Sequence, residues 1–418
     1  MKSKYRKLIP LILIMAVCVI FLLLMTGCSD YTLKGKYINY HGDAGRSNSY
    51  EKYDKFIISS YYTDNYKNGE SAGAIVAPMA MSDYETIYPT TDGRILKLTD
   101  EDIQWTYLLP KGSKVGGYLC ADPDQNIYAV DNNGTIYSLS FEGKLRWKTN
   151  IVEHPLQQDV IPCDLLAIEG GILAGTTDGM ICKIAYDGKM LWKKQLTGSI
   201  MKTLSAENNN PLVVIVSEND ETSDTLEMLN ADGSVKWKRD VGMQIVKYPV
   251  SGENMICVAG IRYVEEQVYS SVFAYDNSGK LLWQKKWTFV PRTISISQDN
   301  DVYVNVFQPG LGEQISALIR LDKTGKMLWK KFFNFTVPTA LLISKSVISF
   351  LGVTSNTVGL YYVNKETGVI DDIQSYSNEA SIIHAPTVRP NGAVSFAFNQ
   401  NIGFLRVDKS WISKMLPF

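Results

Sequence analysis

Short runs of apolar or alternating residues, separated by glycine-bearing turns, recur along most of this 418-residue chain. The segments 126–147 and 172–192 align with each other, and each contains three such runs and two turns. A fourth short run precedes each set, as in 164–168 and 293–297. Runs of this length bounded by Gly, Asn and Asp predict β-strands. The pattern therefore predicts a repeated unit of four short strands.

A tryptophan marks the same place in successive units. Six tryptophans are separated by 42, 45, 45, 46 and 46 residues, namely Trp105, Trp147, Trp192, Trp237, Trp283 and Trp329. A fixed period in the forties indicates a repeat architecture, and four strands per period predict the blade of a β-propeller. We expect each indole to fill the wedge between neighbouring blades, with its N–H bonded to a carbonyl.

The turns within each unit repeat as well. Five of the six tryptophans follow a glycine by four residues, and pairs such as Asn133-Gly134, Asp178-Gly179 and Asp187-Gly188 recur. Asn, Asp and Gly tolerate positive φ, so these pairs predict hairpins of type I′.

Two further units keep the register without the tryptophan. The first places Asp372 at the tryptophan position, and the second, in which 407–410 resembles 321–324, places Met415 there. The chain then holds eight units, of which the first begins near Gly73. The fold expected is an all-β propeller with eight four-stranded antiparallel blades, with seven blades as the alternative.

The motif Asp-Gly-Lys-x-x-Trp after an alternating strand resembles the repeat of quinoprotein-type (PQQ-like) β-propellers, and the segment 37–46 resembles their lead-in to the first blade. The resemblance covers about residues 37–418. It implies the fold, whereas the function varies: the family includes alcohol and glucose dehydrogenases and non-catalytic lipoproteins. One such lipoprotein is the propeller subunit of the outer-membrane barrel-assembly machinery.

The N-terminus is typical of a targeting sequence. Lys2, Lys4, Arg6 and Lys7 precede an uncharged apolar run over 8–25, followed by Thr26-Gly27-Cys28. This order predicts a secretory signal, and the Thr-Gly-Cys ending resembles a bacterial lipobox. Residues 1–27 would then be removed, and Cys28 would carry lipid, including palmitate, that anchors the chain to the membrane. The alternative is an uncleaved transmembrane anchor, and either places the remainder outside the cytoplasmic membrane.

Loss of residues 1–27 removes four of the 42 basic residues and none of the 43 acidic ones, which leaves 38 against 43 and a net charge of −5. A nucleic-acid surface needs a basic stripe, so this balance argues against a nucleic-acid partner. The expected domains are the signal peptide over 1–27, a lipid-anchored spacer and lead-in segment over 28–72, and the propeller over 73–418.

The chain lacks the residues that the dehydrogenase resemblance implies. Those enzymes have a vicinal cysteine pair, a Ca²⁺ set and an Asp base, but no two cysteines here are adjacent. No nucleophile or phosphate-loop motif is present, and the three histidines lack metal-ligand spacing. We expect no catalysis, cofactor or metal. The segments 122–126 and 299–301 are interpreted as polar turns in preference to calcium loops. Cys182 and Cys257 are expected to be buried, and a Cys120–Cys163 disulfide is an open alternative.

Long loops indicate where a partner would bind. The loops between second and third strands share one face with the inter-blade crossovers, and they lengthen in units four to seven, over 218–224, 261–267, 307–313 and 353–357. Insertions on one face of a repeat protein are typical of its binding face, although long loops are also tolerated without function. The candidate residues on this face are Tyr263, Glu265, Phe307, Leu311, Glu313 and His154.

Three functions remain open at this point. The first is a non-catalytic, lipid-anchored scaffold of the cell envelope that binds a protein partner through one propeller face. The second is a glycan or peptidoglycan module that stacks sugars on aromatics such as Trp287, and the third is a degenerate quinoprotein oxidoreductase. The segment 49–70 is tyrosine-rich, and its β character favours partial order, either as a strand that closes the ring or as a spacer.

Overall fold

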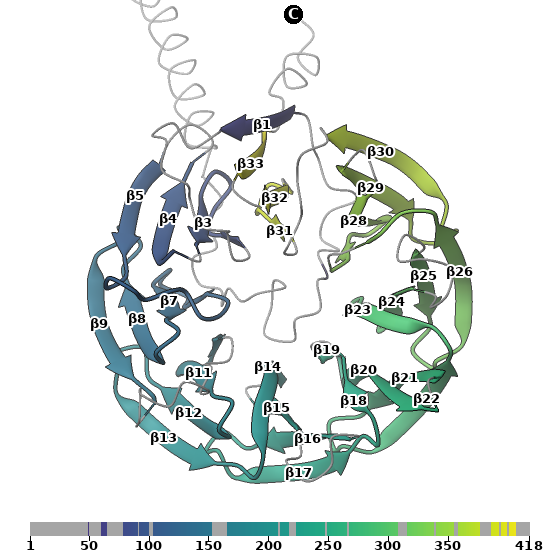
Figure 1. The fold of residues 1–418 in the computed structure, drawn as a ribbon, viewed down its shortest axis with the longest axis horizontal. Coiled ribbons are helices and arrows are strands. Elements are labelled where there is room, and N and C mark those ends of the chain that lie inside the picture. Colours follow the sequence, from purple (N-terminus) through teal and green to yellow (C-terminus); the bar gives the residue numbers. More distant parts are fainter. Residues whose placement is uncertain are drawn as a thin grey trace, which may run out of the picture. The chain divides into compact units, whose positions relative to one another are not determined.

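The computed structural model consists of antiparallel sheets arranged around a central axis (Figure 1). The chain divides into two units, Met1–Thr32 and Leu33–Phe418, and every described residue belongs to the second. The structure describes residues 49, 60–64, 78–90, 92–99, 103–152, 165–207, 210–216, 223–246, 249–265, 267–307, 316–337, 340–354, 358–376, 386–392, 394–398 and 401–406. These residues contain no helix, and hence no helix of the length and hydropathy that a membrane span requires.

The described strands group into eight sheets, numbered here along the chain. Sheet 1 contains β2 (Met79–Ala80), β3 (Thr86–Pro89), β4 (Arg94–Leu98) and β5 (Ile103–Leu108). Sheet 2 contains β6 (Cys120–Ala121), β7 (Ile127–Val130), β8 (Thr135–Leu139) and β9 (Leu145–Asn150). Sheet 3 contains β10 (Leu166–Ile168), β11 (Gly171–Gly175), β12 (Met180–Ile184) and β13 (Met190–Gln195). Sheet 4 contains β14 (Ser199–Glu207), β15 (Asn210–Val216), β16 (Asp224–Leu229) and β17 (Val235–Asp240).

The remaining sheets keep this order, with two departures. Sheet 5 contains β18 (Gln244–Ile245), β19 (Val250–Gly252), β20 (Met255–Val264), β21 (Gln267–Tyr275) and β22 (Leu281–Trp287). Sheet 6 contains β23 (Val290–Ile296), β24 (Val302–Phe307), β25 (Ser316–Leu321) and β26 (Met327–Phe333). Sheet 7 contains β27 (Leu342–Ile343), β28 (Val347–Val353), β29 (Val358–Asn364) and β30 (Ile370–Tyr376). Sheet 8 contains β31 (Thr387–Val388), β32 (Val394–Phe398), β33 (Asn401–Arg406) and β1 (Ser60–Asp64).

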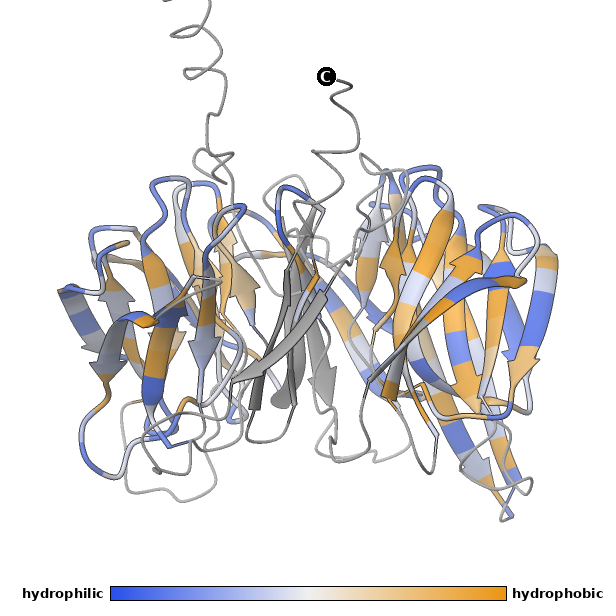
Figure 2. Ribbon diagram, turned by 90° about the horizontal axis from the view of Figure 1, so that it is seen from above, coloured by the Kyte–Doolittle hydropathy of each residue, from blue (hydrophilic) through white to orange (hydrophobic). Residues whose placement is uncertain are grey.

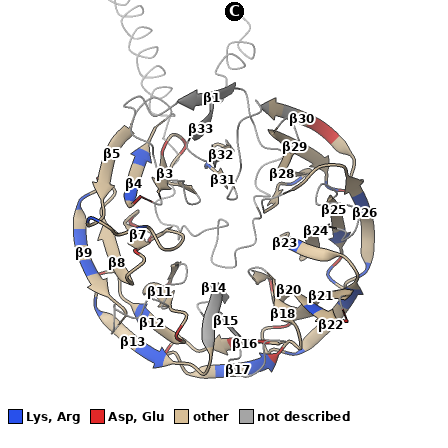
Figure 3. Ribbon diagram, in the orientation of Figure 1, with Lys and Arg blue, Asp and Glu red and all other residues tan. Residues whose placement is uncertain are grey.

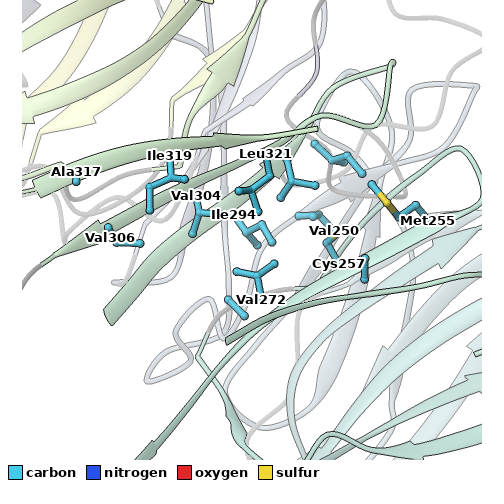
Figure 4. Packing of buried hydrophobic residues seen from close by; sticks show 14 residues of the cluster. Val250, Met255, Cys257, Val272, Ile294, Val304, Val306, Ala317, Ile319 and Leu321 are labelled. Carbon is cyan, nitrogen blue, oxygen red and sulfur yellow. The ribbon is translucent and has the colours of Figure 1, made fainter. Parts of the chain in front are cut away.

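The fold expected from the repeat, a β-propeller of four-stranded antiparallel blades, is confirmed. The hydrophobic core lies between adjacent sheets, because alternate residues of a strand point to opposite neighbours. In β20, Cys257 and Ala259 pack toward sheet 6, as Figure 4 shows for Cys257, whereas Ile256 and Val258 pack with residues of sheet 4. Figure 2 shows apolar (orange) residues along many of the strands and polar (blue) residues in many of the loops that join them.

The repeated tryptophans join each sheet to the next, as expected. Each lies on an outer strand, and its indole N–H donates to a carbonyl of the following sheet at 2.8 to 3.1 Å. The acceptors are the carbonyls of Phe141, Tyr186, Ala231, Asn277, Lys323 and Lys365. The same ring packs on the turn glycine of the following sheet, so tryptophan and glycine recur together. Asp372 occupies the tryptophan position of sheet 7, opposite Tyr362.

The prediction of type I′ hairpins is wrong. At the turn before β13, the Gly188 N–H donates to the Ala185 carbonyl at 2.9 Å, and the Ala185 N–H donates to the Lys189 carbonyl at 2.8 Å. Gly188 has a φ of 93°, whereas Asp187 is not among the described residues with positive φ. This is a type I turn followed by a glycine bulge. The extra residue shifts the register between Lys183 and Ile184.

The N-terminal segment closes the last sheet. β1 pairs with β33 in antiparallel register, Ser60 opposite Arg406 and Asp64 opposite Ile402. We expected the fourth strand of this unit to come from the residues around Met415, which lie outside the described residues, but β1 fills the outer position. Of the two alternatives left open for 49–70, the pairing of β1 supports the closing strand, and β1 precedes residue 73, where we expected the propeller to begin.

Polar side chains join sheet 8 to sheet 1. Arg389 is 1% exposed, and its Nε donates to Thr86 Oγ1 at 3.1 Å. The Asn391 amide donates to the Asp83 carbonyl at 2.9 Å, and Ser395 Oγ lies 3.3 Å from Thr86 Oγ1. The first and last described parts of the propeller are therefore held together by β1 and by this buried contact.

Candidate functional site

The two faces of the ring differ in the loops that they carry. We name the crossover face after the connections from each outer strand to the next sheet, which lie on the same side as the loops between second and third strands. The opposite side carries the short glycine turns between third and fourth strands, such as the turn at Gly188. On the crossover face, sheets 5 and 6 depart from the regular pattern.

β20 and β21 extend past their sheet as a two-stranded ribbon. Their pairing continues to Val264 opposite Gln267, beyond the last partners of their neighbours, which are Ile261 for β18 and Ser270 for β22. The segment 261–267, expected as a loop, is therefore largely strand, and Glu265 forms its turn with a φ of 48°. Regular pairing continues because the tip segments 261–264 and 267–269 contain no Gly or Pro and are rich in β-branched and aromatic residues.

The ribbon exposes apolar side chains. Tyr263 is 63% exposed, Tyr269 44% and Val264 42%, and the Tyr269 hydroxyl donates to Gln267 Oε1 at 2.9 Å. Of the sequence-predicted residues, Tyr263 and Glu265 are thus exposed together at the tip. Tyr269 and Val264 were not among the predicted residues, because the segment 261–267 was expected to be a loop.

Phe307 differs from its expected place in an exposed loop. It is the last residue of β24, half-buried, opposite Val290 and Ser316. The Arg292 guanidinium lies over its ring at 4.7 Å, in a cation–π contact. One face of the Phe307 ring is therefore covered by Arg292, and the ring is not an exposed side chain that a partner could bury. Leu311, Glu313 and His154 lie outside the described residues.

A second aromatic group lies at the ends of β22 and β26. Phe332 is 52% exposed and meets Phe289 edge to face, with ring centroids 6.3 Å apart and planes at 64°. The Lys330 ammonium lies 4.6 Å from the Phe289 centroid and 4.8 Å from the Phe332 centroid. Sequence reasoning missed this group because Phe289 lies in the connection between β22 and β23 and Phe332 lies on β26, so that only the folded arrangement brings them together.

Trp287 ends β22 beside this group. It is half-buried and packs against the core between sheets 5 and 6, and its Nε1 is buried with no hydrogen-bond partner. This arrangement differs from the exposed stacking platform considered for a glycan. Trp411 and Cys28 lie outside the described residues.

The remaining chemical candidates have structural roles. Asp122 is 2% exposed, and its carboxylate accepts from the Tyr128 hydroxyl at 2.7 Å and from two backbone N–H groups of its own turn. Asp301 accepts from Arg320 Nε at 2.8 Å. Across the described ranges, no three His, Cys, Asp or Glu side chains are grouped to hold a metal.

The cysteines are buried, as expected. Cys120, Cys182 and Cys257 lie within strands of the core, and burial raises the pKa of the Cys182 thiol to about 12. Burial raises the pKa of Cys257 as well, so both thiols remain protonated and unreactive at neutral pH. Cys163 lies outside the described residues, so its pairing with Cys120 stays a prediction.

Comparisons with known proteins agree with this fold. The family model described as "Outer membrane protein assembly factor BamB" matches residues 132–308. The structure of BamB from Moraxella catarrhalis is 14% identical, with a TM-score of 0.56 over 83% of this chain and 96% of that one. A search of curated proteins with the sequence found no match.

Two solved enzymes are also similar. A europium-containing methanol dehydrogenase is 11% identical, with a TM-score of 0.65 over 90% of this chain and 91% of that one. The quinohemoprotein alcohol dehydrogenase from Comamonas testosteroni is 12% identical, with a TM-score of 0.64 over 87% and 77%. At these identities the likeness shows the fold. The chain is a β-propeller similar to PQQ-like propellers and to BamB, and the expected resemblance is confirmed.

Proposed function

We propose that this protein is a non-catalytic scaffold of the cell envelope that binds a protein partner through the crossover face of sheets 5 and 6. The observation that carries the proposal is the exposed apolar tip of the β20–β21 ribbon, with Tyr263 63% and Tyr269 44% exposed. Tyrosines are favoured at protein interfaces because they bury a large apolar area with little loss of side-chain entropy. The likeness to BamB, whose name refers to outer-membrane protein assembly, supports an envelope role.

The arrangement of the aromatic rings favours a protein over a glycan. Sugars stack on flat platforms, whereas Phe289 and Phe332 are inclined by 64° and share a lysine between them. A non-catalytic role is supported by the sequence, which lacks the adjacent cysteines of the quinoprotein dehydrogenases. The fold alone does not imply their chemistry, because one fold hosts many functions.

We further propose that each of the eight sheets is one blade, and that lipid at Cys28 anchors the chain outside the cytoplasmic membrane. The pairing of β1 with β33 supports the count, because it supplies the fourth strand of the last sheet. The basic segment, the apolar run and Thr26-Gly27-Cys28 support the anchor. Labelling cells with an alkyne analogue of palmitate tests it: the native chain should take up label, and a Cys28→Ser variant should not.

Photocrosslinking in live cells tests the binding face. A photoreactive phenylalanine derivative at Tyr263 should capture one dominant envelope protein. The control is the same residue at Tyr84, which is 42% exposed in the turn between β2 and β3 on the opposite face. Equal capture from both positions, or none from Tyr263, would contradict the proposal.

A further inference from the structure

The outer strands of the ring carry an excess of basic residues. Five of them, β9, β13, β17, β22 and β26, together contain eleven Lys or Arg and one acidic residue, Asp240. Figure 3 shows this as a basic stretch of the circumference that gives way to acidic residues on β30. The net charge of the whole chain is −1, so it does not reveal this local positive surface on the circumference, which would attract an acidic segment of a partner.

Each of these strands also has an open edge. In the described part of the ring, β26 is hydrogen-bonded to β25 alone, so the N–H and C=O groups along its other edge have no strand beside them. Lysines at such edges discourage aggregation. The same edge can accept an extended peptide as an added strand, with specificity provided by the alternating side chains.

β26 differs from the other basic strands in what accompanies its lysines. On one side of the strand, Leu328, Lys330 and Phe332 alternate, and the first and last are 45% and 52% exposed. Lys331 points to the other side, where its Cγ approaches the turn at Gly368. Neither lysine forms an ion pair with a described residue, whereas Lys238 of β17 pairs with Glu227 at 2.8 Å.

We propose that the edge of β26 binds an extended acidic segment of the partner protein. A strand added beside β26 would place an acidic side chain opposite Lys330 and apolar ones opposite Leu328 and Phe332, since cross-strand neighbours interact in such pairs. Lys330 lies between two phenyl rings, which hold the ammonium in place for a carboxylate. The inference rests on the proposed function, because β26 ends in the aromatic group of the crossover face.

The chain contains a matched control for this site. The sequence Met-Leu-Trp-Lys-Lys occurs at 190–194 in β13 and again at 327–331 in β26. β13 continues with Gln195, whereas β26 continues with Phe332 and Phe333. Both strands have a lysine pair at matching positions, and only β26 has the aromatic group. If negative charge alone were attracted, replacing either lysine pair would weaken binding equally.

The experiment measures, by fluorescence anisotropy, binding of the purified full chain to a labelled peptide that repeats valine, threonine, glutamate and threonine, so that valine and glutamate alternate on one side of the added strand. We expect Lys330→Glu with Lys331→Glu to raise the Kd by roughly tenfold, and Phe332→Ala by roughly fivefold. Lys193→Glu with Lys194→Glu should change the Kd by less than about twofold. The milder Lys330→Gln with Lys331→Gln, checked for an unchanged melting temperature, should weaken binding to an intermediate degree.

Several outcomes would overturn the inference. Equal losses for the β13 and β26 variants would indicate attraction to charge without a site. Competition by inorganic polyphosphate, or by vesicles of anionic phospholipid, as effective as that of unlabelled peptide would also overturn it. The surface would then bind a polyanion or a membrane, and not an acidic peptide. If capture from Tyr263 persists in the Lys330/Lys331 variants and the peptide does not bind, the proposed function stands and only the acidic segment is wrong. Absence of any capture from Tyr263 refutes the proposed function itself.

Discussion

The tryptophan–glycine contact is the residue-scale feature on which the ring depends. The turn glycines have positive φ and lie directly against an indole of the preceding sheet. The sequence could predict the tryptophan's place in the wedge, because a large apolar residue at a fixed period must be buried between repeats. It could not predict the turn type, because Asp-Gly suits a type I′ turn and a type I turn with a bulge alike. The three-residue connection decided between them.

Two glycine substitutions separate the requirement for positive φ from the requirement for space beside the indole. Gly325 has a φ of 81°, and a Cβ there would lie 2.7 Å from Trp283 Cδ2. Gly325→Ala should therefore lower the free energy of unfolding by about 2–4 kcal/mol, from backbone strain and overpacking together. Gly112 has a φ of 89° with no atom within 4 Å of the added Cβ, so Gly112→Ala should cost only about 1 kcal/mol. Urea denaturation measures both, and equal losses would show that the indole contact is unimportant.

Two tryptophans on β22 provide a comparison of hydrogen bonding. Trp283 Nε1 donates to the Lys323 carbonyl at 2.9 Å, whereas Trp287 Nε1 is buried without a partner. Trp283→Phe should lower the free energy of unfolding by about 1 kcal/mol more than Trp287→Phe, because the second change removes an unsatisfied donor. Thermal melts of the two variants measure the difference. The reverse order would mean that the indole of Trp287 is needed at this site.

At the scale of elements, the sequence located the unusual segment but misjudged its structure. Periodicity identified 261–267 as an insertion, and length alone suggested a loop. The β-branched and aromatic residues at 261–264 and 267–269 extend the two strands instead, since each pair of residues gains cross-strand contacts. The aromatic group at Phe289 and Phe332 was beyond prediction because it depends on the packing of one sheet against the next.

The β20–β21 ribbon should be dispensable for stability. Among the described strands, residues 262–264 and 267–269 pair only with each other, and Ile261 lies opposite Ser270. Replacing 262–269 with Asn-Gly should change the free energy of unfolding by less than about 1 kcal/mol, because a type I′ turn joins adjacent strands directly. The same variant should lose binding of the captured partner. As a control, Ala259→Asp in the buried half of β20 should destabilise the protein by at least about 2 kcal/mol.

At the scale of the whole propeller, the ring closes through two contacts between its first and last described parts. β1 supplies the outer strand of sheet 8, and the buried Arg389 joins sheet 8 to Thr86 of sheet 1. Repeat counting could not predict this, because it assigns a unit's four strands to consecutive residues. The closing unit breaks that rule, and the break gives the ring a seam held by pairing between distant segments.

Proline scanning of β1 tests whether the seam stabilises the ring. Tyr61 and Tyr62 pair with Leu405 and Phe404, and successive N–H groups along a strand point to opposite edges. One N–H therefore faces β33 and the other faces away. Proline at the residue whose N–H faces β33 removes a hydrogen bond between the strands and should lower the free energy of unfolding by about 2–3 kcal/mol. Proline at the residue whose N–H faces away should be tolerated, as it is on the outer side of edge strands. Alanine at each position corrects for the lost side chain. A large difference between Tyr61→Pro and Tyr62→Pro in urea denaturation supports closure by β1. Two equally stable variants would show that the ring holds without it.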